Sequence, residues 1–189
     1  MMDDALRQRL EPLLRPLYQE LDGGSRIDEI ERVASIARRL HAPANENARA
    51  FELLLLFHGL GRWLEKIGNR SRAVLTVGLS DTELRTLAGS IRRLDEPSSD
   101  AERALASAIL IDCAGVRGLA EQLVRARRQG ISISDVVRNA VADATVPDWM
   151  PHAGREWLAR RRQARREVCE ALIREMRLED ADTQAGFLV

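Results

Sequence analysis

His58 is the residue of this 189-residue chain whose setting most suggests chemistry, because it interrupts the longest apolar run. Residues 53–64 read Leu-Leu-Leu-Leu-Phe-His-Gly-Leu-Gly-Arg-Trp-Leu. An imidazole titrates near neutral pH and can serve as an acid, a base or a metal ligand. A hydrogen-bonded histidine of the core explains the same pattern, so both interpretations stay open at this point.

The apolar run is too short to cross a bilayer, which needs about 20 apolar residues. A helix that is apolar on all sides belongs in the interior of a domain. The run therefore predicts a buried helix that begins near residue 45 and places His58 inside the fold.

Composition is that of an ordinary soluble globular protein, with 45% apolar and 31% charged residues. The length suits one domain. The formal net charge is +0, so the overall charge favours neither nucleic acid nor an anionic membrane as a partner.

Cys113 and Cys169 show no C-x-x-C spacing and fit reduced thiols better than a disulfide framework. The amino-terminal segment is acidic and amphipathic and lacks the basic and apolar regions of a signal peptide. We therefore expect a cytoplasmic protein.

Apolar residues recur at helical spacing along most of the chain, which predicts an all-α fold in one helical bundle. Pro12 and Pro16 predict a break or kink in the first helix, and the short run 72–77 fits either a strand or a helix. The expected helices cover 3–21, 26–40, 45–64, 80–94, 99–112, a segment ending at 129, 134–144 and 153–178.

Two of these helices carry a capping-box signature at their amino ends, in which a serine precedes a glutamate by three residues. The pairs are Ser80 with Glu83 and Ser99 with Glu102. Gly130 stands where a glycine commonly ends a helix.

The order of these helices and the residues at their ends resemble the HD-domain superfamily of metal-dependent phosphohydrolases. Residues 28–33 (Asp-Glu-Ile-Glu-Arg-Val) resemble the first metal motif, and residues 56–62 (Leu-Phe-His-Gly-Leu-Gly-Arg) resemble the second, normally Leu-Leu-His-Asp-Ile-Gly-Arg. Residues 78–99 and 107–119 resemble the segments that follow. The resemblance implies an amino-terminal helical extension at 1–24, an HD-like domain at 25–178 and a carboxy-terminal tail at 179–189.

The family's site collects histidines and aspartates around divalent ions, which lower the pKa of a bound water. By this resemblance, Glu29 replaces the first histidine, Gly59 replaces the aspartate beside His58, and Ser107 replaces the aspartate of the third motif. His58 alone matches a ligand of the family. Asp112 matches a later aspartate of the third motif.

A pseudoenzyme is the function that this pattern favours. Its ancestral cleft would bind a small anionic or phosphorylated ligand, or a protein partner, without a metal or other cofactor. The resemblance places Arg32, Arg62 and Ser107 at the ligand, where a guanidinium suits a phosphate or a carboxylate. A homo-oligomer is compatible with this function.

Two enzymatic alternatives stay open, so the sequence does not decide whether the protein is an enzyme. In the first, Glu29 and His58 form an acid–base pair within hydrogen-bond reach and Arg62 binds an anion. In the second, Glu29, His58 and Asp112 bind a divalent metal as in a divergent phosphohydrolase, although a catalytic zinc usually has three protein ligands.

Residues 155–166 contain six arginines against one glutamate. Such a run would bind nucleic acid through its phosphates, in a strongly salt-dependent way. The chain as a whole is neutral, and glutamates follow along the same helix, so a solvated helix face is the preferred interpretation. Neither nucleic acid nor a membrane is an expected partner.

Overall fold

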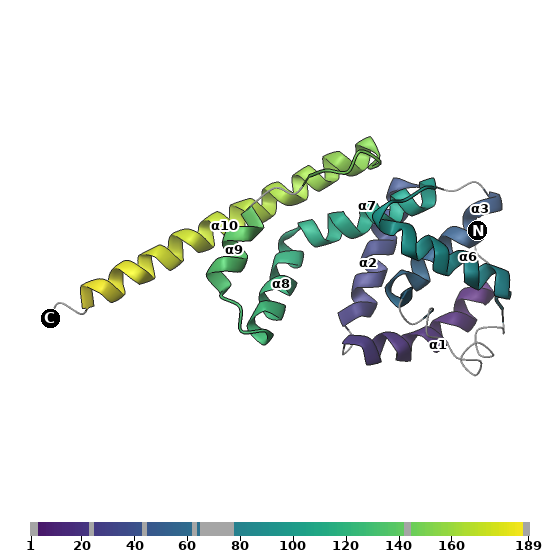
Figure 1. The fold of residues 1–189 in the computed structure, drawn as a ribbon, viewed down its shortest axis with the longest axis horizontal. Coiled ribbons are helices and arrows are strands. Elements are labelled where there is room, and N and C mark those ends of the chain that lie inside the picture. The colour runs from purple at the N-terminus through teal and green to yellow at the C-terminus, as the bar shows by residue number, and fades with distance from the viewer. Residues whose placement is uncertain are drawn as a thin grey trace. The chain divides into compact units, whose positions relative to one another are not determined.

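The computed structural model describes residues 4–22, 25–42, 45–61, 64, 78–141 and 145–186, and these residues contain no strand. The predicted all-α fold class is thereby confirmed. Arg62 and the run 72–77 lie outside the described residues. Along the chain (Figure 1) the elements are α1 (Asp4–Asp22), α2 (Ser25–Leu40), α3 (Asn45–Phe57), η1 (His58–Leu60), α6 (Asp81–Arg92), η2 (Arg93–Asp95), α7 (Asp100–Ala114), α8 (Val116–Arg128), α9 (Ile133–Val141) and α10 (His152–Gly186).

The chain divides into two compact units, which we call unit 1 (Met1–Ile109) and unit 2 (Leu110–Val189). This division differs from the single domain that the sequence suggests over 25–178. The boundary falls inside α7, and a division within a helix leaves no linker-like composition in the sequence. Residues 1–24, expected to form an extension, belong to unit 1, where α1 packs against α2.

Unit 1 is built from α1, α2, α3 and α6 together with the first part of α7. Helix α2 packs against both α1 and α3, and α3 packs against α6. From Phe51 onward, α3 is buried on nearly all sides, as its continuous apolar sequence predicts. Its fully or almost fully buried side chains are Phe51, Leu53, Leu54, Leu55 and Phe57.

Helix α1 continues through Pro12 and Pro16, so the helix is not broken there, and a kink at the prolines stays a prediction. A proline inside a helix removes one backbone hydrogen bond to the carbonyl four residues earlier. Both prolines are exposed, as is Gln8. Carbonyls on a solvent-facing side can bond to water instead, which makes the prolines tolerable there.

The α-helical part of α3 ends at Phe57, whereas the sequence predicts a helix through residue 64. His58–Leu60 form a single 3-10 turn. Side chains bond to two carbonyls at this end: His58 Nδ1 donates to Leu55 O over 2.8 Å, and Tyr18 Oη donates to Leu56 O. These bonds satisfy acceptors that a helix end would otherwise leave open.

Both predicted capping boxes are confirmed. The Ser80 hydroxyl accepts from Glu83 N over 3.2 Å, and Glu83 Oε2 accepts from Ser80 N over 2.8 Å. At the start of α7, Ser99 Oγ accepts from Glu102 N, and Glu102 Oε2 accepts from Ser99 N, each over 3.2 Å. The two helices therefore begin where their local sequence predicts.

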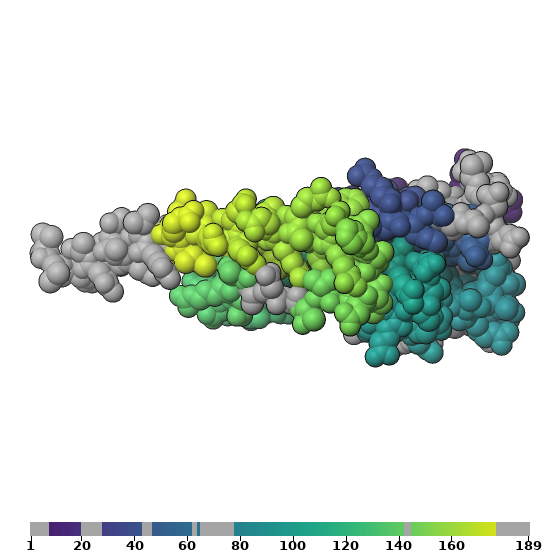
Figure 2. Space-filling view, turned by 90° about the horizontal axis from the view of Figure 1, so that it is seen from above, coloured from purple at the N-terminus to yellow at the C-terminus, as the bar shows by residue number. Residues whose placement is uncertain are grey.

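Unit 2 contains α8, α9 and α10, and its core forms where α10 packs along α9 and α8. Figure 2 shows the outer surface of α10 in yellow-green beside the green side chains of the preceding helices. The buried residues of this core are Leu119, Val137, Ala140 and Cys169, with Leu123, Val141, Val168, Leu172, Ile173 and Met176 packed against them.

Three further predictions concern unit 2. Helix α10 continues to Gly186, so most of the tail expected at 179–189 is helical backbone. Gly130 adopts a φ of 69° directly beyond α8, in agreement with its predicted place at a helix end. Cys113 and Cys169 form no disulfide. Among the described helices, none combines the length and apolar character needed to cross a bilayer.

Candidate functional site

The predicted site residues fall on three helices and in both units. Glu29 and Arg32 lie half-buried on α2, and His58 lies half-buried at the start of η1. Ser107 is completely buried on α7 in unit 1, whereas Asp112 follows on the same helix in unit 2. Arg62 is outside the described residues, so its predicted role as an anion clamp stays a prediction.

His58 makes a local hydrogen bond that orients its ring. Its Nδ1 lies 2.8 Å from the carbonyl oxygen of Leu55, three residues earlier. A carbonyl only accepts, so Nδ1 carries the proton, and in the neutral ring the basic lone pair is on Nε2. This bond supports the interpretation of His58 as a core histidine, while its pairing with Glu29 stays a prediction.

Gly59 stands where the resemblance expects a metal-binding aspartate, and neighbouring side chains fill the space above it. A Cβ added at Gly59 would lie 2.9 Å from Ile30 Cδ1 and 2.9 Å from Tyr18 Cε1. Such contacts are shorter than van der Waals separation, so the side chains of Ile30 and Tyr18 would have to move. A side chain at position 59 would therefore disturb the present packing of these two residues.

The residues at the expected metal positions do not fit a metal site. Among the described residues, no three histidine, cysteine, aspartate or glutamate side chains gather as a metal ion would require. Where the resemblance expects carboxylates, the chain has the hydroxyl of Ser107 and the bare backbone of Gly59. The structure thus offers no support for the alternative ligand set of Glu29, His58 and Asp112.

Glu102 is the centre of a buried, hydrogen-bonded polar cluster in unit 1. Its carboxylate is 1% exposed and accepts from Arg93 Nη2 over 2.6 Å and from Ser98 N and Ser98 Oγ over 2.9 Å each. Burial raises the pKa of this carboxyl, but the hydrogen bonds from Arg93, Ser98 and Ser90 outweigh burial and lower the pKa to about 2. Because these bonds occupy the carboxylate, we assign it a structural role.

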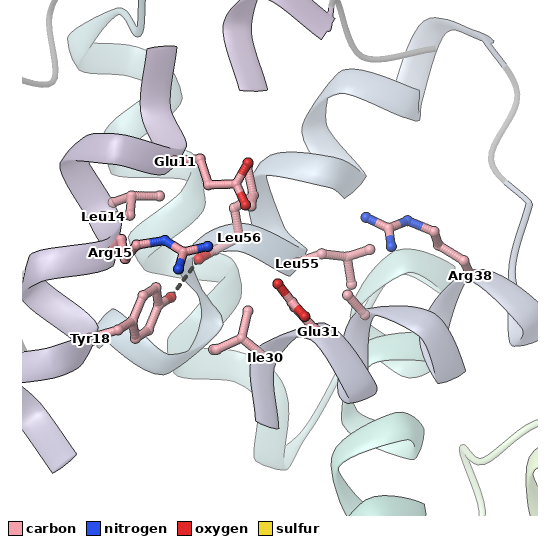
Figure 3. Close-up of a pocket in the computed structure, with 10 residues that line it drawn as sticks. Glu11, Leu14, Arg15, Tyr18, Ile30, Glu31, Arg38, Leu55 and Leu56 are labelled. Atoms are coloured by element: carbon pink, nitrogen blue, oxygen red, sulfur yellow. Dashed lines mark hydrogen bonds between the residues drawn. The ribbon is translucent and has the colours of Figure 1, made fainter. Parts of the chain in front are cut away.

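A pocket between α1, α2 and α3 is the better candidate for a ligand site, and we call it the first pocket. It encloses about 350 Å³, within the usual range for small-molecule sites. Figure 3 shows Glu11 and Arg15 reaching toward it from α1 and Glu31 from α2. Its walls also include the buried or half-buried apolar side chains of Leu14, Tyr18, Ile30, Ala34, Leu55 and Leu56.

Some of the charged side chains around the first pocket are already paired within the protein, and others are not. Arg38 is held by Glu52 in a bidentate pair, with Nε to Oε1 at 2.8 Å and Nη2 to Oε2 at 2.6 Å. The hydrogen bonding of Arg38 to the Glu52 carboxylate is the main cause that raises the pKa of Arg38. Neither Arg15 nor Glu31 has an ion pair among the described residues. One guanidinium and one carboxylate are therefore available to a ligand.

The sequence did not point to the first pocket. Its α1 wall was assigned to an extension, and none of Glu29, Arg32, His58 and Ser107 lines it. A local signal was present, because Glu11 and Arg15 are four residues apart and share one face of α1. The spacing of residues along a helix shows which of them share a face. It does not show which other helix that face contacts.

The chain was also compared with protein-family models, with curated proteins and with solved structures, and none of these comparisons found a match. The resemblance to HD-domain phosphohydrolases therefore stays a prediction drawn from the residues.

Proposed function

We propose that unit 1 is a non-catalytic ligand-binding domain and that its first pocket binds a small amphiphilic anion. The anionic group of the ligand would meet Arg15, and its apolar part would lie against Leu14 and Ile30. The ligand class is the one expected for a pseudoenzyme of the HD type. The site is different, because the first pocket lies beside the expected cleft residues rather than among them.

One observation carries this proposal: Arg15 borders an apolar pocket and has no carboxylate partner among the described residues. A guanidinium presents paired donors that match a carboxylate or phosphate in two parallel hydrogen bonds. The other arginine of this pocket, Arg38, already has such a partner in Glu52.

The carboxylate of Glu31 limits the charge of the ligand. It reaches the first pocket from α2, opposite Arg15 on α1 (Figure 3), and it has no ion pair among the described residues. A second negative group on the ligand would be repelled by Glu31. We therefore expect a monoanion in preference to a dianion.

A binding role agrees with what the structure places at residues 58 and 59, where the resemblance expects catalytic groups. The space at Gly59 is filled by Tyr18 and Ile30, and His58 uses Nδ1 in a local hydrogen bond. No carboxylate stands beside His58 at residue 59, whereas the first pocket offers volume, an apolar wall and one available cation.

Titration calorimetry with octanoate and 1-octanol tests the proposal. We expect octanoate to bind saturably and 1-octanol to bind more weakly. Arg15→Gln should weaken octanoate binding by about 10-fold or more, since a hydrogen bond to a charged group is worth about 1.5–3 kcal/mol. Glu31→Gln should strengthen it, because a like charge is removed.

Arg9→Gln is the matched control, because Arg9 is an exposed arginine of α1 that does not line the first pocket. Its octanoate affinity should equal that of the wild type. The proposal fails if octanoate does not bind, or if Arg15→Gln and Arg9→Gln retain the same affinity.

A further inference from the structure

A second pocket of unit 1 lies between α3, α6 and the first turn of α7. It encloses about 580 Å³ and shares no lining residue with the first pocket. This volume again lies within the usual range for small-molecule sites. The site therefore has to be explained independently of the proposed anion pocket.

The apolar side of the second pocket is formed by buried side chains of α3 and α6. Phe51, Leu53, Leu54 and Leu87 are each less than 7% exposed. The ring of His41, which follows α2, meets Phe51 edge to face, with centroids 5.2 Å apart and planes at 85°. Aromatic and aliphatic walls of this kind favour a ring-shaped apolar ligand.

The arginine and the carboxylates around the second pocket are already paired with other groups of the protein. Arg49 Nε pairs with Glu83 Oε1 at 2.9 Å, and Arg49 Nη2 donates to Gly78 O over 2.8 Å. Asp100 Oδ1 lies 3.4 Å from Arg103 Nη1. A charged ligand would have to compete with these pairs for a partner.

The amino end of α7 also borders the second pocket, and an uncapped helix end would attract an anion. Here Ser99 Oγ accepts from Glu102 N, and the Glu102 carboxylate accepts from the backbone of Ser98 and Ser99. The end is thus capped by the protein's own negative charge, which disfavours an anionic ligand.

Uncharged hydrogen-bonding groups remain available around the same pocket. Thr82 and Thr86 lie one turn apart on α6, and Asn47 lies across from them on α3. None of these three side chains has a hydrogen-bond partner in the described part of the chain. Together they offer two hydroxyls and one amide, which can both donate and accept.

We propose that the second pocket binds an uncharged ring compound that carries a hydrogen-bonding group at one edge. The ring would pack on Phe51 and Leu54, and its polar edge would bond to Thr82 and Thr86. This inference rests on a contrast between two kinds of group around the pocket. The arginine and the carboxylates are already paired, whereas the two threonines and the asparagine have no hydrogen-bond partner in the described part of the chain. It goes beyond the proposed function, because the ligand is of a different class and the site is separate.

Three probes of one shape test this inference on the full chain: benzamide, benzoate and benzylammonium. They share a phenyl ring and differ in the charge of the attached group. Methyl-labelled NMR should show that benzamide shifts the signals of Leu54, Leu87 and Thr86 saturably, with a Kd on the order of 1 mM, as expected for so small a ligand. Benzoate and benzylammonium should bind at least about 10-fold more weakly, because the arginine and the carboxylates around the pocket are already paired and a buried charge without a partner is costly.

Two variants separate the site from general effects. Ala50→Phe places a ring in the pocket from an exposed position of α3 and should abolish benzamide binding. Thr86→Val removes one hydroxyl without changing the shape of the side chain and should weaken binding by about two- to tenfold. Thr145→Val, at an exposed position of unit 2, is the matched control and should change nothing.

Three outcomes would overturn the inference: benzamide shifts no methyl of the second pocket, benzoate or benzylammonium binds as tightly as benzamide, or Ala50→Phe leaves benzamide binding intact. The octanoate titration reports on Arg15 and the first pocket, so the failure of either proposal can be recognised separately.

Discussion

Replacing Glu102 by glutamine removes one negative charge from the interior of unit 1 and leaves the shape of the side chain nearly unchanged. The carboxylate is 1% exposed and accepts hydrogen bonds from Arg93, Ser98 and Ser99. Glutamine has one acceptor oxygen, and its amide group would face donors that need an acceptor. Glu102→Gln should therefore destabilise unit 1 at neutral pH.

The lowered pKa of Glu102 sets the size of this effect and its pH dependence. A fall from the ordinary 4.5 to about 2 in the folded protein corresponds to about 3 kcal/mol of stability. Because the folded-state pKa is the lower one, this stability is present above pH 4.5 and is lost as the pH falls through 2. We expect about 3 kcal/mol above pH 5, about half of that at pH 3 and less than about 1 kcal/mol at pH 2.

Urea unfolding of the wild type and Glu102→Gln at pH 7, 5, 3 and 2 measures this difference directly. Other carboxylates titrate equally in both proteins, so subtracting one curve from the other isolates Glu102. Glu83→Gln is the control, because it alters the other capping box at a side chain that is 36% exposed, where solvent weakens the effect to about 1 kcal/mol or less. A difference for Glu102→Gln that stays constant from pH 7 to pH 2 would refute the reasoning.

Two further predictions concern packing and reactivity. Gly59→Ala should lower the free energy of unfolding by about 1–3 kcal/mol in urea, because the new Cβ would lie 2.9 Å from Ile30 Cδ1 and from Tyr18 Cε1; unchanged stability would contradict the observed packing. Iodoacetamide should modify the exposed Cys113 well before Cys169, because Cys169 is fully buried and burial raises the pKa of its thiol. Peptide mass spectrometry would detect this order, and equal rates would contradict it.

Local sequence signals were sufficient to predict that the chain forms helices and where two of these helices begin. A serine followed three residues later by glutamate predicted the amino ends at Ser80 and Ser99, since the capping box is made within four consecutive residues. The glycine at 130 likewise predicted a helix end, because a φ of 69° suits glycine. Such features need no knowledge of distant parts of the chain.

Contacts between distant residues could not be predicted in the same way. Arg93 reaches Glu102 from the turn that joins α6 to α7, as Arg49 reaches Glu83 from α3. Burial of the glutamate side chain, 2% exposed against 36%, is what distinguishes the second capping box from the first. The helical period predicted which faces are apolar but not which faces meet. For that reason the sequence did not predict the first pocket, which is formed by three helices, and its pattern shows no sign of the boundary between the two compact units within α7.

The same contacts that fill the expected metal position also form part of the first pocket. Tyr18 and Ile30 approach Gly59 closely, and both of these side chains line the first pocket on its α1 and α2 sides. The absence of a side chain at residue 59 thus lets α1 and α2 close over the end of α3, where Tyr18 also bonds to the carbonyl of Leu56. If this packing shapes the ligand site, Gly59→Ala should weaken octanoate binding under conditions in which the variant is still folded, although residue 59 does not line the pocket. Wild-type affinity in such a folded variant would show that the first pocket forms independently of Gly59.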